Sequence, residues 1–509
     1  MASLSSSTTI PPLASSPFPS TTAADSTAST SSSSSSFKPP SSILIIGSGV
    51  FGLGTALALT RRDAFTNCSI TIVDRSDPSQ PGAFPAPDAA SVDTSRIVRA
   101  DYADPAYAAL CDEAQIQWRK QDKPTDLGAQ GRYTETGLIV VGDATAPVAP
   151  ASGPAVVSEE PTQKVKLTGL DYARKSWANV QSLASGNPAL AERIQELPNP
   201  QAIREALGTG GTSGAWGYIN RNSGWANAGT SMAWLLEQVK NTGRVSFLAG
   251  TVESLEHDEA TVTGAKLAGG RVLTADLVMV AAGAWTGSLV DLEGQALATG
   301  QVLGYMDITE EEQQKLGGMP VILNLSTGLF IIPPTNRVLK IARHAYGYLN
   351  PQTLPTAPLP VLPQLTSNKT VSVPKTSVTD PDLSIPAEGA ADLRAALQEM
   401  IPLPELRDRP FTKTRLCWYS DTRTADFLID YHPHWRNLFV ATGDSGHAFK
   451  FLPVIGDKIA DCIMRNCPPQ FKGKWDWKGG DMTALFTEDG SRGGKPGLSL
   501  VDELGKLTI

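Results

Sequence analysis

The sequence of 509 residues has few cysteines, no long apolar run and no excess of basic charge. Its cysteines are odd in number and follow no repeated spacing of metal ligands: Cys68, Cys111, Cys417, Cys462 and Cys467. This pattern argues against a disulfide framework or a metal site and predicts a reducing compartment. No uninterrupted apolar segment approaches the roughly 20 residues that span a bilayer, so we expect no membrane partner.

The net charge of −8 leaves no basic face for phosphate binding, which argues against a nucleic-acid partner. Hydrophobic residues make up 41% of the chain and charged residues 18%, as in globular enzymes. The length predicts two or three domains, because it exceeds what one core usually organises.

The first 37 residues contain neither Lys nor Arg and are rich in Ser, Thr, Ala and Pro. They resemble neither a secretory signal nor an Arg-rich transit peptide, so we expect a disordered tail over residues 1–39. We predict a cytoplasmic or peroxisomal protein with no clear targeting signal, since the ending Lys-Leu-Thr-Ile lacks the small-Lys-Leu pattern of peroxisomal proteins.

The most informative motif is the segment 43–54, Ile-Leu-Ile-Ile-Gly-Ser-Gly-Val-Phe-Gly-Leu-Gly, which predicts a strand, a tight turn and a helix. Gly47 permits the turn, Gly49 lets a pyrophosphate approach the backbone, and Gly52 lets the helix pack against the strand. Val50 and Phe51 lie in the same loop. The motif therefore predicts a dinucleotide site, against the alternative of an ordinary glycine-rich turn.

A second apolar strand over 69–73 ends at Asp74, which lies 74 − 52 = 22 residues after Gly52. An acid at this spacing binds a ribose hydroxyl in dinucleotide-binding βαβ units. We therefore predict that Asp74 and the neighbouring Arg75 contact the cofactor.

Three further apolar segments, 245–250, 275–282 and 437–441, are short enough to be strands that rejoin the nucleotide sheet. Val252 follows the first of them, and Gly283 follows the second. A strand that ends in small residues packs beneath a flavin in flavoproteins, although a plain strand end before a helix explains the pattern as well. We count Val252 and Gly283 among the candidate cofactor-binding residues.

The segment 441–456 predicts a glycine-rich loop that leads into a helix over 457–464. A helix dipole directed at a flavin would stabilise the negative charge of the reduced ring. A capped surface helix explains the glycines but not Lys450, which stands among apolar neighbours. The candidate cofactor-binding residues of this loop are Gly446, His447, Phe449 and Lys450.

The predicted fold class is α/β plus α+β, with a Rossmann-type cofactor domain that is discontinuous in sequence and a mixed-sheet substrate domain. We assign residues 40–104, 222–298 and 405–467 to the cofactor domain, 105–221 and 299–404 to the substrate domain, and 468–509 to a C-terminal extension. Helical patterns cover 105–120 and 163–207, strand patterns cover 137–141 and 328–332, and Pro-rich loops cover 76–90, 143–161 and 351–384.

Four motifs occur in order: the glycine loop, Asp93-Thr94-Ser95-Arg96-Ile97-Val98-Arg99, the Cys417-Trp418-Tyr419 segment, and Gly446-His447-Ala448-Phe449-Lys450. Together they resemble the sarcosine oxidase and fructosyl amino acid oxidase (amadoriase) family of FAD-dependent amine oxidases, within the D-amino acid oxidase superfamily. The resemblance covers about residues 40 to 465. It implies FAD as cofactor, a small-molecule amine and O2 as substrates, and a monomeric protein.

By this resemblance Cys417 carries the flavin as a thioether to its 8-methyl carbon. The residues alone also allow a small buried hydrophobe at this position. The segment 330–344 predicts a hairpin in which Lys340 and His344 face the same side of the returning strand. The resemblance places Lys340 over the flavin, where its charge helps O2 accept an electron, and His344 in the substrate pocket; a solvated edge-strand lysine is the alternative.

The same resemblance assigns Ser95 and Arg96 to the surroundings of the flavin. It assigns Arg99 and Lys450 to the substrate carboxylate, with Tyr419 nearby, and a guanidinium suits that task because it offers two parallel donors. Alternatively, Arg99 pairs with Asp101 or Asp104 on the surface. The chain departs from many amadoriases in having Thr-Ser-Arg after Asp93 where they have Asn-Lys.

The implied activity is hydride transfer from a secondary amine to covalent flavin, which leaves an imine and reduces O2 to H2O2. Fructosyl amino acids, N-methyl amino acids, saccharopine and pipecolate are the substrates of such relatives. Three alternatives stay open: a fungal secondary-metabolism oxidase whose imine is trapped by intramolecular C–C bond formation, an FAD dehydrogenase with another electron acceptor, and a non-catalytic redox sensor.

Overall fold

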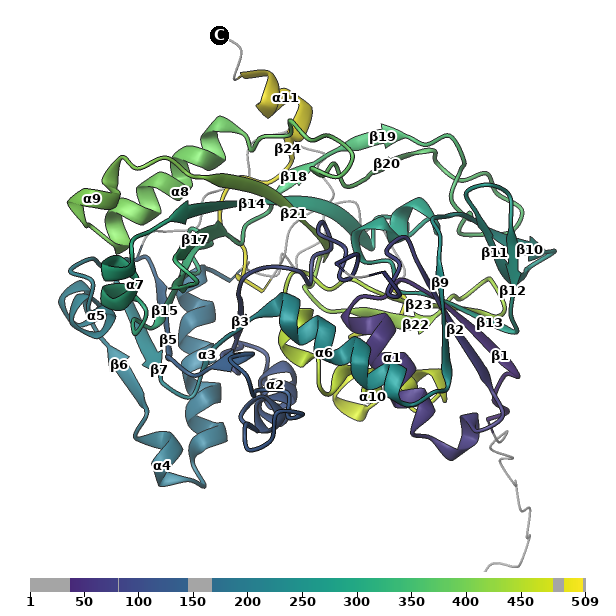
Figure 1. The fold of residues 1–509 in the computed structure, drawn as a ribbon, viewed down its shortest axis with the longest axis horizontal. Coiled ribbons are helices and arrows are strands. Elements are labelled where there is room, and N and C mark those ends of the chain that lie inside the picture. The colour runs from purple at the N-terminus through teal and green to yellow at the C-terminus, as the bar shows by residue number, and fades with distance from the viewer. Residues whose placement is uncertain (1–36, 81, 145–166, 479–488, 507–509) are drawn as a thin grey trace, which may run out of the picture. The chain divides into compact units, whose positions relative to one another are not determined.

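The computed structural model describes residues 37–80, 82–144, 167–478 and 489–506 (Figure 1). The described residues from 39 onward form one unit, and most of their strands belong to a six-stranded and a ten-stranded sheet. The predicted tail up to residue 36, nearly all of the loop predicted over 143–161 and the first residues of the segment 163–207 lie outside the described residues.

The six-stranded sheet contains the glycine motif and is parallel except at one edge, where β22 runs antiparallel to β23. Its order is β22 (Leu428–Tyr431), β23 (Leu438–Thr442), β13 (Leu277–Val280), β1 (Ser42–Ile46), β2 (Ser69–Asp74) and β9 (Val245–Ala249). The prediction that three later apolar segments rejoin the nucleotide sheet is confirmed by β9, β13 and β23.

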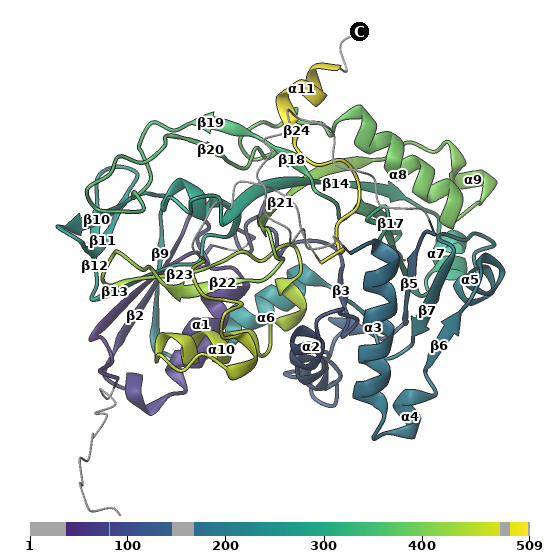
Figure 2. The ribbon, with the colours of Figure 1, turned by 180° about the vertical axis from the view of Figure 1, so that it is seen from behind.

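Both faces of this sheet are covered, which explains why β1 is apolar from Ile43 onward. Leu44 and Ile46 pack with Leu255 and Val262 of the antiparallel ribbon β10 (Val252–Asp258), β11 (Thr261–Leu267) and β12 (Val272–Thr274). On the other side α1 (Val50–Thr60) packs against α6 (Ala228–Asn241) and α10 (Ile455–Ile463), as Figures 1 and 2 show. The helix predicted over 457–464 is α10.

The ten-stranded sheet is mixed, as predicted for the second half of the fold. Its order is β24 (Leu498–Ser499), β18 (Tyr348–Leu349), β14 (Ala296–Asp307), β17 (Val338–Arg343), β16 (Leu329–Thr335), β15 (Val321–Asn324), β5 (Leu138–Gly142), β7 (Trp216–Asn220) and β6 (Ile194–Leu197), and β21 (Lys413–Thr422) pairs separately with β14. The hairpin predicted over 330–344 is confirmed as β16 and β17. The segment 405–467, which was assigned to the cofactor domain, contains β21, and β21 pairs with the ten-stranded sheet. The domain boundaries themselves stay a prediction.

Helices cover both faces of the ten-stranded sheet. α8 (Ala387–Met400) packs on the side of Leu339 and Ile341, and α3 (Gly169–Ala184) packs on the side of Ala342, Cys417 and Tyr419. Because side chains alternate along a strand, Lys340 of β17 lies on the same face as Cys417 and Tyr419. This face of the sheet forms one wall of the candidate site.

Shorter elements complete the described part of the unit. The strands β3 (Arg96–Val98), β8 (Gly224–Ala226) and β4 (Tyr133–Thr134) form a small antiparallel sheet. Further helices are α2 (Pro105–Trp118), α7 (Glu310–Leu316), α9 (Pro404–Arg407), α11 (Leu500–Gly505) and the 3₁₀ turns η1 (Asp63–Phe65), η2 (Gly283–Ser288), η3 (Ala448–Phe451) and η4 (Pro469–Phe471). The helix predicted over 105–120 is confirmed by α2, whose N-terminus is capped by Asp104.

Two predicted segments differ from the structure. The helical segment over 163–207 is interrupted, because α3 is followed by α4 (Pro188–Ala191), the strand β6 and then α5 (Pro200–Leu207). Pairing with β7 makes 194–197 a strand, which helical periodicity could not reveal. The Pro-rich tract 351–384 is not structureless, since β19 (Pro351–Thr353) and β20 (Thr370–Ser372) form a hairpin.

Candidate active site

In the glycine motif, two positions have no room for a side chain, and a third faces open space. Gly47 has a φ of +108°, and a Cβ there would lie 2.4 Å from the carbonyl oxygen of Ala281. A Cβ on Gly52 would lie 1.9 Å from the carbonyl oxygen of Gly47. A Cβ on Gly49, at the N-terminus of α1, would meet no atom within 4 Å. Gly49 therefore faces open space where a pyrophosphate would lie on the helix N-terminus.

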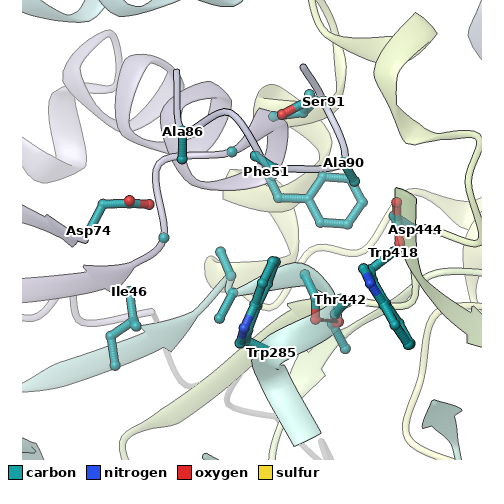
Figure 3. Close-up of a pocket in the computed structure, with 18 of the residues that line it drawn as sticks. Ile46, Phe51, Asp74, Ala86, Ala90, Ser91, Trp285, Trp418, Thr442 and Asp444 are labelled. Atoms are coloured by element: carbon teal, nitrogen blue, oxygen red, sulfur yellow. Dashed lines mark hydrogen bonds between the residues drawn. The ribbon is translucent and has the colours of Figure 1, made fainter. Parts of the chain in front are cut away.

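A cavity of about 280 Å³ opens in front of this loop. Figure 3 shows Asp74 at one end of the cavity and Trp418 and Asp444 at the other. Asp74 is held in place because its carboxylate accepts hydrogen bonds from the backbone N–H groups of Ser48 at 2.7 Å and Ser76 at 2.9 Å. An elongated cavity that begins at the glycine loop, with a carboxylate at the ribose position, fits FAD.

Most of the predicted cofactor-binding residues line this cavity. They are Gly47, Gly49, Val50, Phe51, Asp74, Arg75, Arg96, Val252, Gly283, Gly446 and Phe449. Gly52 lies behind the loop, His447 and Lys450 line a neighbouring pocket, and neither Ser95 nor Cys417 lines either space. The backbone carbonyl of Ser95 instead accepts a hydrogen bond from Lys340 at 2.6 Å.

A second, smaller pocket of about 60 Å³ adjoins the cavity. Four residues line both spaces: Arg96, Tyr419, Gly446 and Phe449. The five residues predicted to act on the substrate all line this pocket: Arg99, Lys340, His344, Tyr419 and Lys450. The structure thus brings together residues from four separate regions of the chain in a pocket that adjoins the cavity.

Lys340 is almost completely buried and forms an ion pair with Asp93. Its Nζ lies 2.6 Å from Oδ2 of Asp93, and the two side chains are 2% and 1% exposed. Burial lowers the pKa of Lys340 to about 8, against the opposing effect of the Asp93 charge. The alternative of a solvated edge-strand lysine does not apply, since Lys340 lies inside the ten-stranded sheet.

Arg99 is buried in the pocket wall and lies over the ring of Tyr102, with 4.8 Å between the guanidinium carbon and the ring centroid. Its Nη1 has no hydrogen-bond partner among the residues that the structure describes. The alternative of a surface ion pair is not observed, because Asp101 is buried and bound by Ser223 and Asn220. A buried cation with a free donor suits an anionic ligand.

Lys450, which lies in η3, contacts the same tyrosine. Its Nζ donates hydrogen bonds to the Tyr102 hydroxyl and to the carbonyl oxygen of His447, both at 2.9 Å. His447 Nε2 lies 2.8 Å from the Ala425 carbonyl oxygen, so Nε2 carries the hydrogen and Nδ1 accepts from Tyr102 at 2.9 Å. Burial first, and then Arg99, lowers the pKa of Lys450 well below its usual range.

His344 is oriented by Arg492, a residue of the C-terminal extension. Arg492 Nη1 lies 2.8 Å from His344 Nδ1, and Arg492 also pairs with Asp421. Because arginine can only donate, Nδ1 accepts and the hydrogen of the neutral ring lies on Nε2. Burial and the charge of Arg492 lower the pKa of His344 well below its usual range. His344 is therefore a neutral donor.

Cys417 is fully buried on β21, one residue from Trp418, which lines the cavity. Arg96 Nη2 lies 3.2 Å from its sulfur. The structure describes all five cysteines as free thiols. The sulfur thus contacts Arg96 and the carbonyl oxygen of Ala90, two residues that line the cofactor cavity.

Five residues of the site were not predicted to act there: Asp93, Tyr102, Trp285, Asp444 and Arg492. Trp285 and Asp444 line the cavity, and burial raises the pKa of Asp444 to about 7. Asp93, Trp285 and Asp444 lie in or directly beside motifs that the sequence reveals, so their position in the sequence could have identified them as site residues. Arg492 carries no such signal, because only the fold returns the C-terminal extension to the pocket.

Among the described residues, no cluster of three or more His, Cys, Asp or Glu side chains could hold a metal ion. No helix in the described part of the chain has the length and apolar character that a membrane crossing requires.

Comparisons with known proteins agree with the cavity. The family model "FAD dependent oxidoreductase" (DAO) matches residues 42–462. Amino acid oxidase imqH of Aspergillus flavus is 33% identical over 494 residues, covering 87% of this chain and 98% of the relative. Amino acid oxidase fsqB of Aspergillus fumigatus is 31% identical over 480 residues, covering 84% and 92%.

L-saccharopine oxidase of Schizosaccharomyces pombe is 28% identical over 468 residues, covering 87% of this chain and 94% of the relative. Among solved structures, a thermally stable mutant of fructosyl peptide oxidase superposes with a TM-score of 0.72 at 24% identity, covering 91% of this chain and 98% of that chain. This last likeness supports the fold.

Proposed function

This chain belongs to the family of FAD-dependent oxidoreductases as an amine or amino acid oxidase related to sarcosine oxidase, and from that premise we propose that it oxidises the secondary amine of an N-substituted amino acid. The proposed substrate class includes N-methyl amino acids, fructosyl amino acids, saccharopine and pipecolate. The proposed electron acceptor is O2.

One observation carries the proposal: Arg99 and Lys450 meet around Tyr102 in a pocket that adjoins the FAD cavity. Arg99 has an unpaired donor, and the charge of a bound carboxylate would favour the protonated form of Lys450, so the two side chains suit a carboxylate. Because these charges are fixed by buried contacts, the carboxylate would be oriented before the reaction begins.

The chemistry that FAD supplies when bound is removal of a hydride from the carbon next to the nitrogen and transfer of the electrons to O2, leaving an imine and H2O2. The protein needs no nucleophile for this reaction. Arg99 and Lys450 would hold the carboxylate, His344 would donate a hydrogen bond from Nε2, and Lys340 would place a positive charge near O2. We also propose that Cys417 attaches the flavin covalently.

The rest of the pocket wall favours a substrate whose other end is apolar. Ile97, Leu323, Phe330 and Ile332 line the pocket, and none of them offers a side-chain hydrogen bond. A polyhydroxylated sugar would lose its hydrogen bonds to water against such a wall. Among the proposed substrates, apolar N-methyl amino acids therefore fit this pocket better than fructosyl amino acids.

The test is a panel of these amines mixed anaerobically with the purified enzyme and scored by bleaching of the flavin absorbance. We expect bleaching by at least one N-substituted amino acid and stoichiometric H2O2 under air. Bleaching without peroxide would indicate a dehydrogenase, and no bleaching by any amine would contradict the proposal.

Substitution of the two cations tests the carboxylate site. Arg99→Met and Lys450→Met should each lower kcat/KM by about 10- to 100-fold, because a hydrogen bond to a charged group contributes about 1.5–3 kcal/mol. Lys458→Met is the matched control, since Lys458 pairs with Glu113 on the surface. For an amine that lacks the carboxylate, all three substitutions should change kcat/KM equally little.

A further inference from the structure

Asp93 is the only carboxylate that faces Lys340 closely within the described residues, and it is itself fully enclosed. Its Oδ2 lies 2.6 Å from Lys340 Nζ and 3.3 Å from Arg96 Nη1. Its Oδ1 accepts hydrogen bonds from the Tyr305 hydroxyl at 2.9 Å and from the Thr94 backbone at 2.7 Å. The carboxylate is thus fixed on both oxygens.

The elements around this pair contribute more positive than negative charge. Arg96 of β3 and Arg415 of β21 both act on Asp93, and Arg415 is held by the backbone carbonyls of Ala89 and Val92 at 2.8 and 2.6 Å. Cys417 and Tyr419 of β21 and Tyr305 of β14 are further titratable groups that act on Lys340, Arg96 or Asp93. One buried carboxylate therefore faces three cations: Lys340, Arg96 and Arg415.

The two kinds of cation respond differently to this imbalance. Arginine does not lose its proton in proteins, whereas a buried lysine does so readily. If the Asp93 charge were absent, Lys340 would be the group that relieves the repulsion, by becoming neutral. The state of Lys340 thus depends on Asp93.

We infer that Asp93 is a positioning residue that keeps the Lys340 amine charged and aimed at the site of O2 reduction; this rests on the proposed function, in which Lys340 serves O2. The reaction FADH2 + O2 → FAD + H2O2 moves two electrons and two protons to O2. Its first electron makes an oxygen anion, which a nearby cation stabilises and a neutral amine does not.

The experiment measures the reaction with O2 without needing the amine substrate. Enzyme with FAD bound is reduced anaerobically with dithionite and mixed with O2-containing buffer, and the return of flavin absorbance is followed between pH 6 and 10. In the wild type we expect the rate to fall as pH rises through about 8. In Asp93→Asn the midpoint of this fall should move down by about 1 to 3 pH units.

A four-protein cycle separates this effect from a structural one. The proteins are the wild type, Asp93→Asn, Lys340→Met and the double variant. Lys340→Met should slow reoxidation and remove the fall of its rate with rising pH. In the double variant, the added Asp93→Asn substitution should cause no further pH dependence. A shift of the midpoint that persists in the Lys340→Met background, or an equal loss of rate at every pH, would overturn the inference.

Stability supplies a readout that does not depend on activity. A buried lysine with a lowered pKa makes the free energy of unfolding rise with pH between its folded and unfolded pKa values. Denaturant unfolding should show this rise beginning at lower pH in Asp93→Asn than in the wild type, and no such rise attributable to position 340 in Lys340→Met. If Asp93→Asn alone does not fold while the double variant does, the pairing is supported, because the double variant has one uncompensated cation fewer than Asp93→Asn.

Tyr305→Phe is the matched control, since it removes a hydrogen bond from the same carboxylate and leaves its charge. Its midpoint should stay within a few tenths of a pH unit of the wild type. If Lys340→Met leaves reoxidation unchanged, the proposed role of Lys340 fails. If Lys340→Met slows reoxidation and Asp93→Asn keeps the wild-type midpoint, only the inference about Asp93 fails.

Discussion

The Lys450 amine donates a hydrogen bond to the Tyr102 hydroxyl at 2.9 Å, and the same hydroxyl donates to His447. Arg99 lies over the ring of the same tyrosine. Tyr102 is therefore the shared support of both side chains proposed to bind the carboxylate.

Tyr102→Phe removes this support without changing the shape of the ring. We expect a loss of about 1–3 kcal/mol in the free energy of unfolding, because Nδ1 of His447 loses its donor in a buried site. KM for the amino acid substrate should rise more than kcat falls, since Lys450 loses its orientation. Denaturant unfolding and steady-state kinetics measure the two effects. Tyr431→Phe is the control, because its hydroxyl bonds the Ile463 carbonyl outside the pocket; equal KM values in both variants would contradict this role.

Cys417→Ala tests the covalent flavin. In acid-denatured wild-type protein we expect the yellow colour to remain with the chain, and in Cys417→Ala we expect it to be released completely. Cys111→Ala, which removes another buried thiol, should retain the colour. Release of the flavin from the wild-type chain would show that the attachment is not covalent.

Gly49→Ala and Gly52→Ala form a matched pair within one turn of helix. A Cβ at Gly52 collides with the Gly47 carbonyl, so Gly52→Ala should lower the free energy of unfolding by at least about 2 kcal/mol. A Cβ at Gly49 meets nothing, and its φ of −75° suits any residue, so the protein without FAD should keep its stability within about 0.5 kcal/mol.

The same Gly49→Ala protein should nonetheless bind FAD poorly, because the added methyl group occupies the space where the pyrophosphate approaches the backbone. Flavin content after purification and equilibrium unfolding of the flavin-free protein give the two quantities. Full flavin content in Gly49→Ala would argue against a pyrophosphate at this loop.

Acid should destabilise the protein through its buried histidines. Burial lowers the pKa values of His344 and His447 well below the value of about 6.5 in an unfolded chain. The unfolded state therefore binds more protons below pH 6.5, and the free energy of unfolding falls by up to about 1.4 kcal/mol per pH unit for each histidine. Unfolding measured from pH 7 to 5 should show a smaller slope in His447→Gln, and an unchanged slope in a variant of the exposed His257.

Local patterns were enough to predict the cofactor half of the site. The glycine loop, Asp74 and the strand ends before Gly283 and Gly446 lie in a βαβ geometry that short-range sterics impose. Glycines at fixed spacing indicate where a backbone must turn or leave room. The hairpin that presents Lys340 was predictable for a similar reason, because alternation along a strand decides which residues share a face.

Long-range packing limited the rest. The strand β6 was predicted as helix, because its identity comes from pairing with β7 and not from its own sequence. Arg492 was missed because it is separated from His344 by 148 residues and by a segment with no recognisable pattern. The hairpin β19–β20 was likewise hidden in a Pro-rich tract whose composition indicates a loop.

The sequence by itself determined the turn at the glycine loop, the apolar strands of the nucleotide sheet and the residue types available for an amine oxidase. These features follow from the allowed backbone angles of glycine and from the burial of apolar strands. Only the tertiary structure decided which charges meet: Asp93 with Lys340, Lys450 and Arg99 at Tyr102, and Arg492 with His344. Electrostatic energy inside a protein depends on distance and burial, and neither can be read from residues that lie hundreds of positions apart.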